Sequence, residues 1–212
     1  MEKPKLRGVL HQFAAVGVLG AGGVLVSMAP TARAAAAAAL YAISLVVLFS
    51  VSATYHRVDW SPRGRVWMRR MDHASIFILI AGTYTPIALL GVAGTAGDSL
   101  LRAIWCGALV GVLQSLFWVQ APKVVTAALA VGVGWTLVPY LDEARHALGA
   151  VELSLILAGG VAYTLGAVAY ALKRPDLRPG VFGYHELFHA LTLVGAGLHF
   201  VVVLRLVQAA ST

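Results

Sequence analysis

The chain of 212 residues has little charge and a single cysteine. Only 12% of its residues are charged and 59% are apolar, whereas about 25% are charged and about 45–50% apolar in an average soluble domain. This composition excludes intrinsic disorder, which requires low hydrophobicity and high charge. Cys106 has no second cysteine in the chain to pair with, which excludes an internal disulfide scaffold. Almost no sequence lies outside the apolar runs, so a large soluble enzyme with a regulatory domain is excluded too.

Acidic residues are scarcer than basic ones, with 9 Asp and Glu against 16 Lys and Arg, for a net charge of +7. The basic residues form no continuous face. They occur in short groups between apolar runs, which is typical of integral membrane proteins. We therefore expect membrane lipids as partners and no nucleic acid.

Seven apolar runs are long enough to cross about 30 Å of hydrocarbon as helices. Because backbone groups in lipid must satisfy their own hydrogen bonds, we expect these runs to be helical. The predicted fold class is an all-α integral membrane protein, with residues 1–212 forming one domain of seven transmembrane helices. The predicted spans are about 12–29, 35–55, 73–91, 100–119, 122–141, 151–172 and 184–207.

The distribution of basic residues predicts the orientation. With a cytoplasmic N-terminus, twelve Lys and Arg fall inside and four outside, namely Arg33, Arg102, Arg145 and Arg205. This asymmetry predicts a cell (inner) membrane protein with its N-terminus in the cytoplasm and its C-terminus outside. An alternative is that the first run is a signal peptide cleaved near Ala32-Arg33-Ala34. Six helices with the same orientation would then remain.

Ionisable residues inside predicted spans are functional candidates, because each costs a few kcal/mol to insert. Ser52 and His56 share a helix face at the end of the second span, Asp72 begins the third, and His185 and His189 share a face at the start of the seventh. Taken singly, a histidine or an acid at a helix end also suits water and the helix dipole. Together they lie on one side of the membrane by parity of the crossings. Three imidazoles and a carboxylate at one depth predict a zinc site.

The stretch His185-Glu186-Leu187-Phe188-His189 also has the letters H-E-x-x-H, the zinc-protease pattern in which the glutamate is the general base. The pattern is short, and Glu186 lies about 100° around the helix from His185. We expect Glu186 to face the loops or a basic partner such as Arg69 or Arg70.

Three other histidines stand apart from this set. His199 lies deeper in the seventh span, where we expect it to hydrogen-bond a neighbouring helix. His11 and His146 fall at predicted helix ends and loops, and we assign them no role.

The combination of motifs resembles the hemolysin III proteins, which belong with the progestin and adipoQ receptor family, including the adiponectin receptors; the wider group includes alkaline ceramidases. The resemblance covers about residues 10–208. It is carried by Ser52-x-x-x-His56, Asp72, Ile80-Ala81-Gly82-Thr83-Tyr84-Thr85-Pro86, His185-Glu186-x-Phe188-His189 and His199-Phe200.

The resemblance implies seven transmembrane helices with zinc near the cytoplasmic face. His56, His185 and His189 would be the zinc ligands. Asp72 would complete the metal set by holding the zinc-bound water, and Ser52 would lie beside that water.

Three functional hypotheses follow. Three neutral histidines leave one position on zinc open, which favours a hydrolase acting on a lipid amide or ester, with Asp72 moving the proton and Ser52 stabilising the oxyanion. The alternative is a non-enzymatic, receptor-like or membrane-perturbing (hemolytic) protein with structural zinc. A transporter is disfavoured because the polar groups gather on one side, whereas transport sites usually lie near the midplane.

Overall fold

The computed structural model describes residues 4–92 and 94–210. Within these residues, seven helical segments are long and apolar enough to cross a membrane, which confirms the predicted all-α membrane fold. The fifth crossing combines α5, a short 3-10 turn and α6, so α7 and α8 form the sixth and seventh crossings. The elements are α1 (Val9–Ser27), α2 (Ala32–Arg57), α3 (Pro62–Pro86), η1 (Ile87–Val92), α4 (Gly94–Phe117), α5 (Lys123–Gly134), η2 (Val138–Tyr140), α6 (Leu141–Ala147), α7 (Ala150–Leu172) and α8 (Tyr184–Ala209).

The third helix starts well before residue 73, the predicted start of its span. The Ser61 hydroxyl accepts a hydrogen bond from the Gly64 amide, and Pro62 occupies the first turn, where its missing N–H costs nothing. The basic stretch that follows is therefore helical although it is not apolar. The hydropathy pattern located only the part of α3 that can lie in hydrocarbon.

Two crossings are interrupted in the half of the bundle opposite the start of α3. The α-helical pattern of the third crossing ends at Pro86 and continues as a π-helix, η1, because proline lacks an N–H for the helical ladder. The fifth crossing breaks after Gly134 and resumes as the short helix α6. At the end where α3 starts, both crossings are uninterrupted α-helices, and the polar residues lie at that end.

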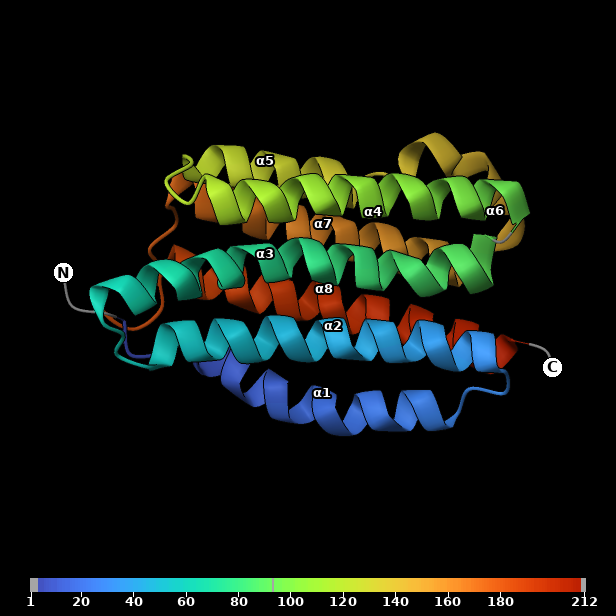
Figure 1. Ribbon diagram of the computed structural model, residues 1–212, viewed down its shortest axis with the longest axis horizontal. Helices are drawn as coiled ribbons and strands as arrows, with labels where there is room; N and C mark the ends of the chain where they lie inside the picture. Colours follow the sequence, from blue (N-terminus) through green and yellow to red (C-terminus); the bar gives the residue numbers. More distant parts are fainter. Residues whose placement is uncertain (1–3, 93, 211–212) are drawn as a thin grey trace.

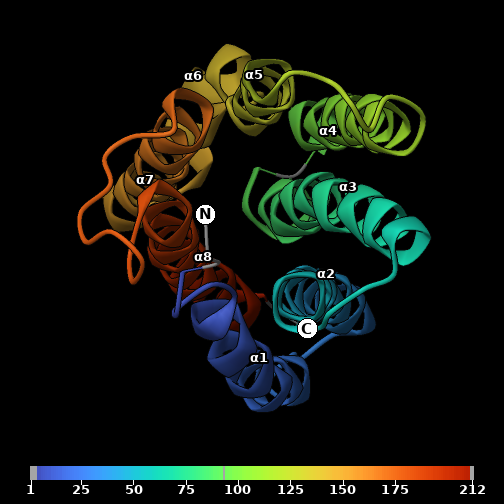
Figure 2. The ribbon, with the colours of Figure 1, turned by 90° about the vertical axis from the view of Figure 1, so that its left-hand side faces the viewer.

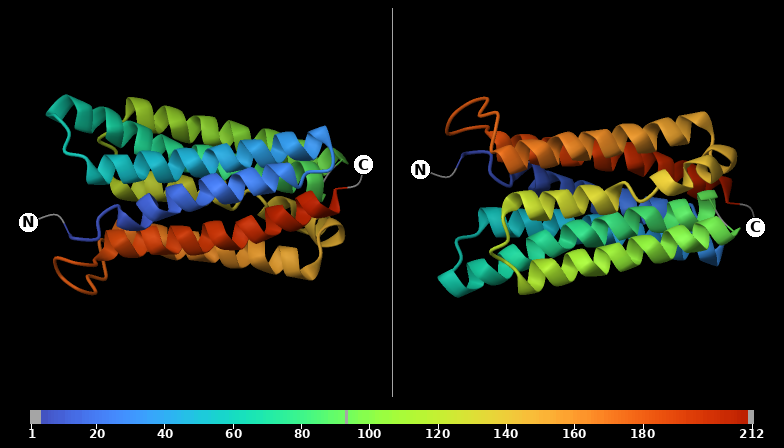
Figure 3. Two further views of the ribbon diagram at one scale, coloured as in Figure 1. Left: turned by 90° about the horizontal axis from the view of Figure 1, so that it is seen from below. Right: turned by 90° about the horizontal axis from the view of Figure 1, so that it is seen from above.

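The helices from α2 to α8 follow one another around a ring, and α1 lies outside it against α2 and α8 (Figure 2). The side views show α1 on one side of the bundle and α5, between α4 and α7, on the other (Figure 3). α8 contacts α1, α2, α3 and α7. Its neighbouring residues Val202 and Val203 belong to two different buried clusters, so α8 is packed on two sides.

One end of the bundle collects several helix termini that are far apart in the sequence, and we call it the site end. The starts of α1, α3, α5 and α8 lie there together with the ends of α2 and α7 (Figure 1). The end of α8 lies at the opposite end. Four crossings separate the end of α2 from the start of α8, and this even number brings the first turn of α8 to the same end as the last turn of α2.

Candidate metal centre

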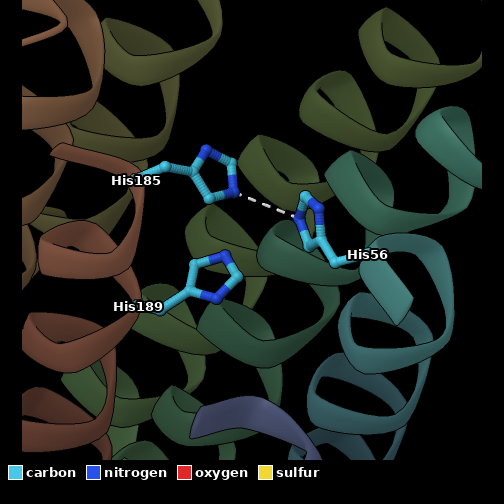
Figure 4. Close-up of side chains that lie close together, drawn as sticks. All are labelled: His56, His185 and His189. Carbon is cyan, nitrogen blue, oxygen red and sulfur yellow. Dashed lines mark hydrogen bonds between the residues drawn. The ribbon is translucent and has the colours of Figure 1, made fainter. Parts of the chain in front are cut away.

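Three buried histidines converge at the site end. His56 comes from the last turn of α2, and His185 and His189 come from the first two turns of α8, one turn apart on the same face. Their rings point toward one another (Figure 4). The Nε2 atoms of His56 and His185 are 3.1 Å apart, and one ring nitrogen from each histidine lies within 4.8 Å of the others. We call these residues the histidine triad; they could hold one metal ion.

The predicted Asp72 and Ser52 lie beside the triad. The Asp72 Oδ2 is 3.9 Å from the His56 Nε2, and the Asp72 side chain is only 13% exposed. Ser52, one turn before His56 on α2, is buried and forms a side-chain hydrogen bond with Asp72. The structure therefore brings together all five residues that the sequence placed in one leaflet, from three different helices.

Glu186 turns away from the triad. Arg7 Nε donates to the Glu186 Oε1, and the Gly183 backbone N–H donates to the Glu186 Oε2 at 2.9 Å. Glu186 thus has a basic partner, but the partner is Arg7 and not Arg69 or Arg70 as expected. The segment before α1 runs along the loop that leads into α8, with a hydrogen bond from the Lys5 N–H to the Gly180 carbonyl oxygen at 3.1 Å. Both carboxylate oxygens of Glu186 are therefore engaged, and the bond to the Gly183 N–H caps the start of α8.

His11, to which the sequence assigned no role, is part of this centre. It lies in the first turn of α1, is 2% exposed, and its Nδ1 is 2.9 Å from the Ser52 Oγ. Its ring stacks on that of His189, with centroids 3.8 Å apart and planes 3° from parallel. The first span was predicted to begin at residue 12, which left His11 just outside it. The order of the crossings was the one feature of the sequence that could have placed His11 at this centre, because the start of the first crossing lies at the same end of the bundle as the end of the second.

The remaining histidines have separate environments. His199 Nε2 is 3.0 Å from the Ile156 carbonyl oxygen of α7, which confirms its predicted hydrogen bond to a neighbouring helix. His146 lies in the exposed helix α6, where its Nδ1 is 2.6 Å from the Asp142 carbonyl oxygen. Neither belongs to the triad.

A cavity of about 130 Å³ leads from the centre into the bundle. Its polar end is lined by His11, Ser52, Asp72 and His189, and its deep end reaches His199. A second cavity of about 150 Å³ shares part of the deep wall, including His199. Most of the lining between these ends is aliphatic or aromatic, so an apolar group can extend inward from the histidine triad.

The comparisons with known proteins agree with this arrangement. The family model described as "Haemolysin-III related" matches residues 1–200. Hemolysin-3 of Bacillus cereus is 29% identical over 82% of this chain and 76% of its own. The heptahelical transmembrane protein ADIPOR2 of Oryza sativa subsp. japonica is 32% identical, covering 77% of this chain and 79% of its own.

A human relative, monocyte to macrophage differentiation factor, is 24% identical over 77% of this chain and 67% of its own. These matches confirm the resemblance to the hemolysin III proteins and to the progestin and adipoQ receptor family. The motif residues, the seven crossings and the family model all lead to the same conclusion: the chain belongs to the haemolysin-III related family.

Proposed function

We propose that this protein is a zinc-dependent membrane hydrolase that cleaves an amide or ester bond of a lipid. The observation that carries the proposal is the histidine triad, with a carboxyl and a hydroxyl beside it, at the polar end of an apolar cavity inside a membrane bundle. A lipid can place its head at the triad and its acyl chain in the cavity.

The donor set fits zinc. Imidazole nitrogens bind zinc at about 2.0–2.1 Å, so two ligands of a tetrahedral ion are about 3.4 Å apart. The two Nε2 atoms of His56 and His185 are 3.1 Å apart, and one ring nitrogen from each histidine of the triad lies within 4.8 Å of the others. Burial among apolar helices favours neutral imidazoles, which is the form that binds a metal.

Three protein donors suit a catalytic site better than a sealed structural one, because structural zinc sites usually have four protein ligands. Bound zinc supplies a polarised carbonyl and a water of lowered pKa. The chain itself provides the residues that move the proton and orient the reactants.

Asp72 is placed to move a proton, since its Oδ2 lies 3.9 Å from the His56 Nε2. In the proposed reaction, water adds to the carbonyl carbon and gives a proton to the Asp72 carboxylate. The C–N or C–O bond then breaks, and Asp72 returns the proton to the departing amine or alcohol. Before the reaction the Ser52 hydroxyl donates to the Asp72 carboxylate. Once Asp72 holds the proton from water, the Ser52 O–H is free to donate to the negatively charged carbonyl oxygen and stabilise it.

The site end belongs, in this proposal, to the cytoplasmic leaflet of the cell membrane. The segment before α1, the end of α2, the starts of α3 and α5, and the loop between α7 and α8 lie at this end and carry most of the basic residues. The N-terminus is then cytoplasmic and the C-terminus outside. The substrate enters from that leaflet, and the arginines near the start of α3 attract anionic headgroups.

Zinc content of the purified protein in detergent tests the metal site. We expect one zinc per chain in the wild type and in Asp72→Asn, and a loss of zinc in His189→Ala. Equal zinc in the wild type and His189→Ala, with both proteins folded, would contradict the metal proposal.

A comparison of total lipid extracts tests the reaction. Cells that express the wild type should contain less of one lipid amide or ester, and more of its acid product, than cells that express equal amounts of Asp72→Asn. Identical extracts, together with no hydrolysis of any lipid by zinc-loaded protein, would contradict the hydrolase proposal.

The second candidate is a receptor-like or membrane-perturbing protein in which the metal is structural. It is favoured by the name of the Hemolysin-3 relative and by the triad itself, which joins α2 to α8. In that case His189→Ala would lower stability, whereas Asp72→Asn would keep both zinc and function. The lysis of erythrocytes by the wild type and by both variants distinguishes the two candidates.

A further inference from the structure

His11 is an unusual residue for its helix. α1 exposes most of its surface, and its buried residues are only His11, Gly22 and Leu25. A buried histidine on such a helix is costly in a membrane unless its nitrogens have a use.

The segment before α1 is shaped to bring His11 to the centre. Gly8 has a φ of 77°, and a Cβ built there would lie 2.7 Å from the Cβ of His56. Glycine therefore permits both the left-handed backbone and the close approach of α1 to the last turn of α2. His11, three residues later, then faces the metal-binding side chains.

The ring of His11 is held by several contacts. One face stacks on His189, and Phe49 approaches at a steep angle with its centroid 5.0 Å away. In this orientation Nδ1 reaches the Ser52 Oγ at 2.9 Å. Nε2 has no hydrogen-bond partner among the described residues, and His11 lines the cavity.

The chemistry of the three groups gives the hydrogen bonds a direction. An ionised carboxylate can only accept, so the Ser52 O–H donates to Asp72. The Ser52 Oγ then accepts from His11, which requires the tautomer with the hydrogen on Nδ1. A single chain results, from His11 Nδ1–H to the Ser52 hydroxyl and on to the Asp72 carboxylate.

We infer that His11 is a positioning residue of the metal centre, which orients the Ser52 hydroxyl toward Asp72. A serine hydroxyl rotates freely and can also donate to the carbonyl one turn back in its own helix. The donation from Nδ1 occupies a lone pair of Oγ and leaves the O–H pointing at the carboxylate. The inference rests on the proposed function, because it assigns His11 to the residues that serve the metal.

Two amide substitutions separate this role from simple packing. Asn places an amide nitrogen at the position of Nδ1 and keeps a donor for Ser52, whereas Gln places its amide at the position of Nε2. Both remove the ring, so a difference between them reports the hydrogen bond and not the loss of stacking. The measured quantity is the zinc dissociation constant of the purified full-length protein, from competition with a chelator, and Co²⁺ absorption provides a second readout.

We expect His11→Gln to weaken zinc binding by about tenfold, within the range of about 10–100-fold for outer-shell partners of metal sites. His11→Asn should stay within about threefold of the wild type. In a Ser52→Ala background His11→Gln should have no further effect, whereas a purely structural role would cost the same in both backgrounds. If His11→Gln does not fold, His11→Phe replaces it, because it keeps a flat ring against His189 and lacks the donor.

Equal affinities for His11→Asn and His11→Gln, or an unchanged effect of His11→Gln in Ser52→Ala, would overturn the inference. A different result would contradict the metal proposal itself: the wild type would then bind no more zinc than His189→Ala.

Discussion

The ion pair between Arg7 and Glu186 should be a main support of the site end. It joins residues 179 positions apart and ties the segment before α1 to the first turn of α8. The Glu186 side chain is 1% exposed and the Arg7 side chain 21%. If Arg7 is removed, the remaining charge of Glu186 is buried away from water. If Glu186 is removed, the remaining charge of Arg7 is partly exposed to water.

Arg7→Met leaves a buried carboxylate with only the Gly183 N–H as partner. Breaking a buried ion pair costs about 3–5 kcal/mol, and the partial exposure of Arg7 puts our expectation at about 3 kcal/mol. Replacing both residues by Met removes the unpaired charge and leaves mainly the lost helix-capping bond, at about 1 kcal/mol. We therefore expect the double variant Arg7→Met/Glu186→Met to be more stable than Arg7→Met alone.

The assay is equilibrium unfolding in mixed detergent micelles at a fixed zinc concentration, with circular dichroism as the signal. The wild type, both single variants and the double variant form a double-mutant cycle. If the double variant unfolds as easily as Arg7→Met, or if Arg7→Met costs less than about 1 kcal/mol, the buried carboxylate does not depend on Arg7 and the reasoning is refuted.

Three further predictions concern the deep part of the bundle and the metal. A Cβ at Gly159 would lie 2.4 Å from the His199 ring, whereas a Cβ at Gly197 meets nothing within 4 Å. In thermal unfolding, we therefore expect Gly159→Ala to lower the free energy of unfolding by about 1–3 kcal/mol and Gly197→Ala to lower it by nearly nothing. Tyr84→Phe removes the 2.6 Å hydrogen bond to the Gly134 carbonyl oxygen, and we expect a loss of about 1 kcal/mol in chemical unfolding, with no loss contradicting a role for this bond. Chelation of zinc should lower the melting temperature of the wild type, since a ligand at a thousand times its Kd stabilises by about 4 kcal/mol, but should leave His189→Ala unchanged; equal shifts in both would contradict binding at the triad.

The location of the histidine triad could be predicted from the sequence because it depends on the crossings alone. Each apolar run crosses once, so parity assigns the end of α2 and the start of α8 to one end of the bundle. The spacing of four residues between His185 and His189 then puts both on one helix face. The helix ends were less predictable, because Ser61 and Pro62 extend α3 beyond its apolar part.

The partners of individual side chains could not be read from the sequence. Hydropathy places His11 near the correct end of the bundle, but it does not define how α1 is rotated, and that rotation puts the ring against His189 and Ser52. Glu186 has Arg69, Arg70 and Arg7 near the same surface, and only the path of the segment before α1 selects Arg7.

The sequence by itself determined the number of crossings and the end of the bundle at which the polar residues gather, because the cost of burying charge and backbone groups in lipid acts locally along the chain. The tertiary structure alone decided which side chains touch and where the apolar cavity begins. Those features depend on close packing between helices that are distant in sequence, and a small rotation of any one of them would change every contact.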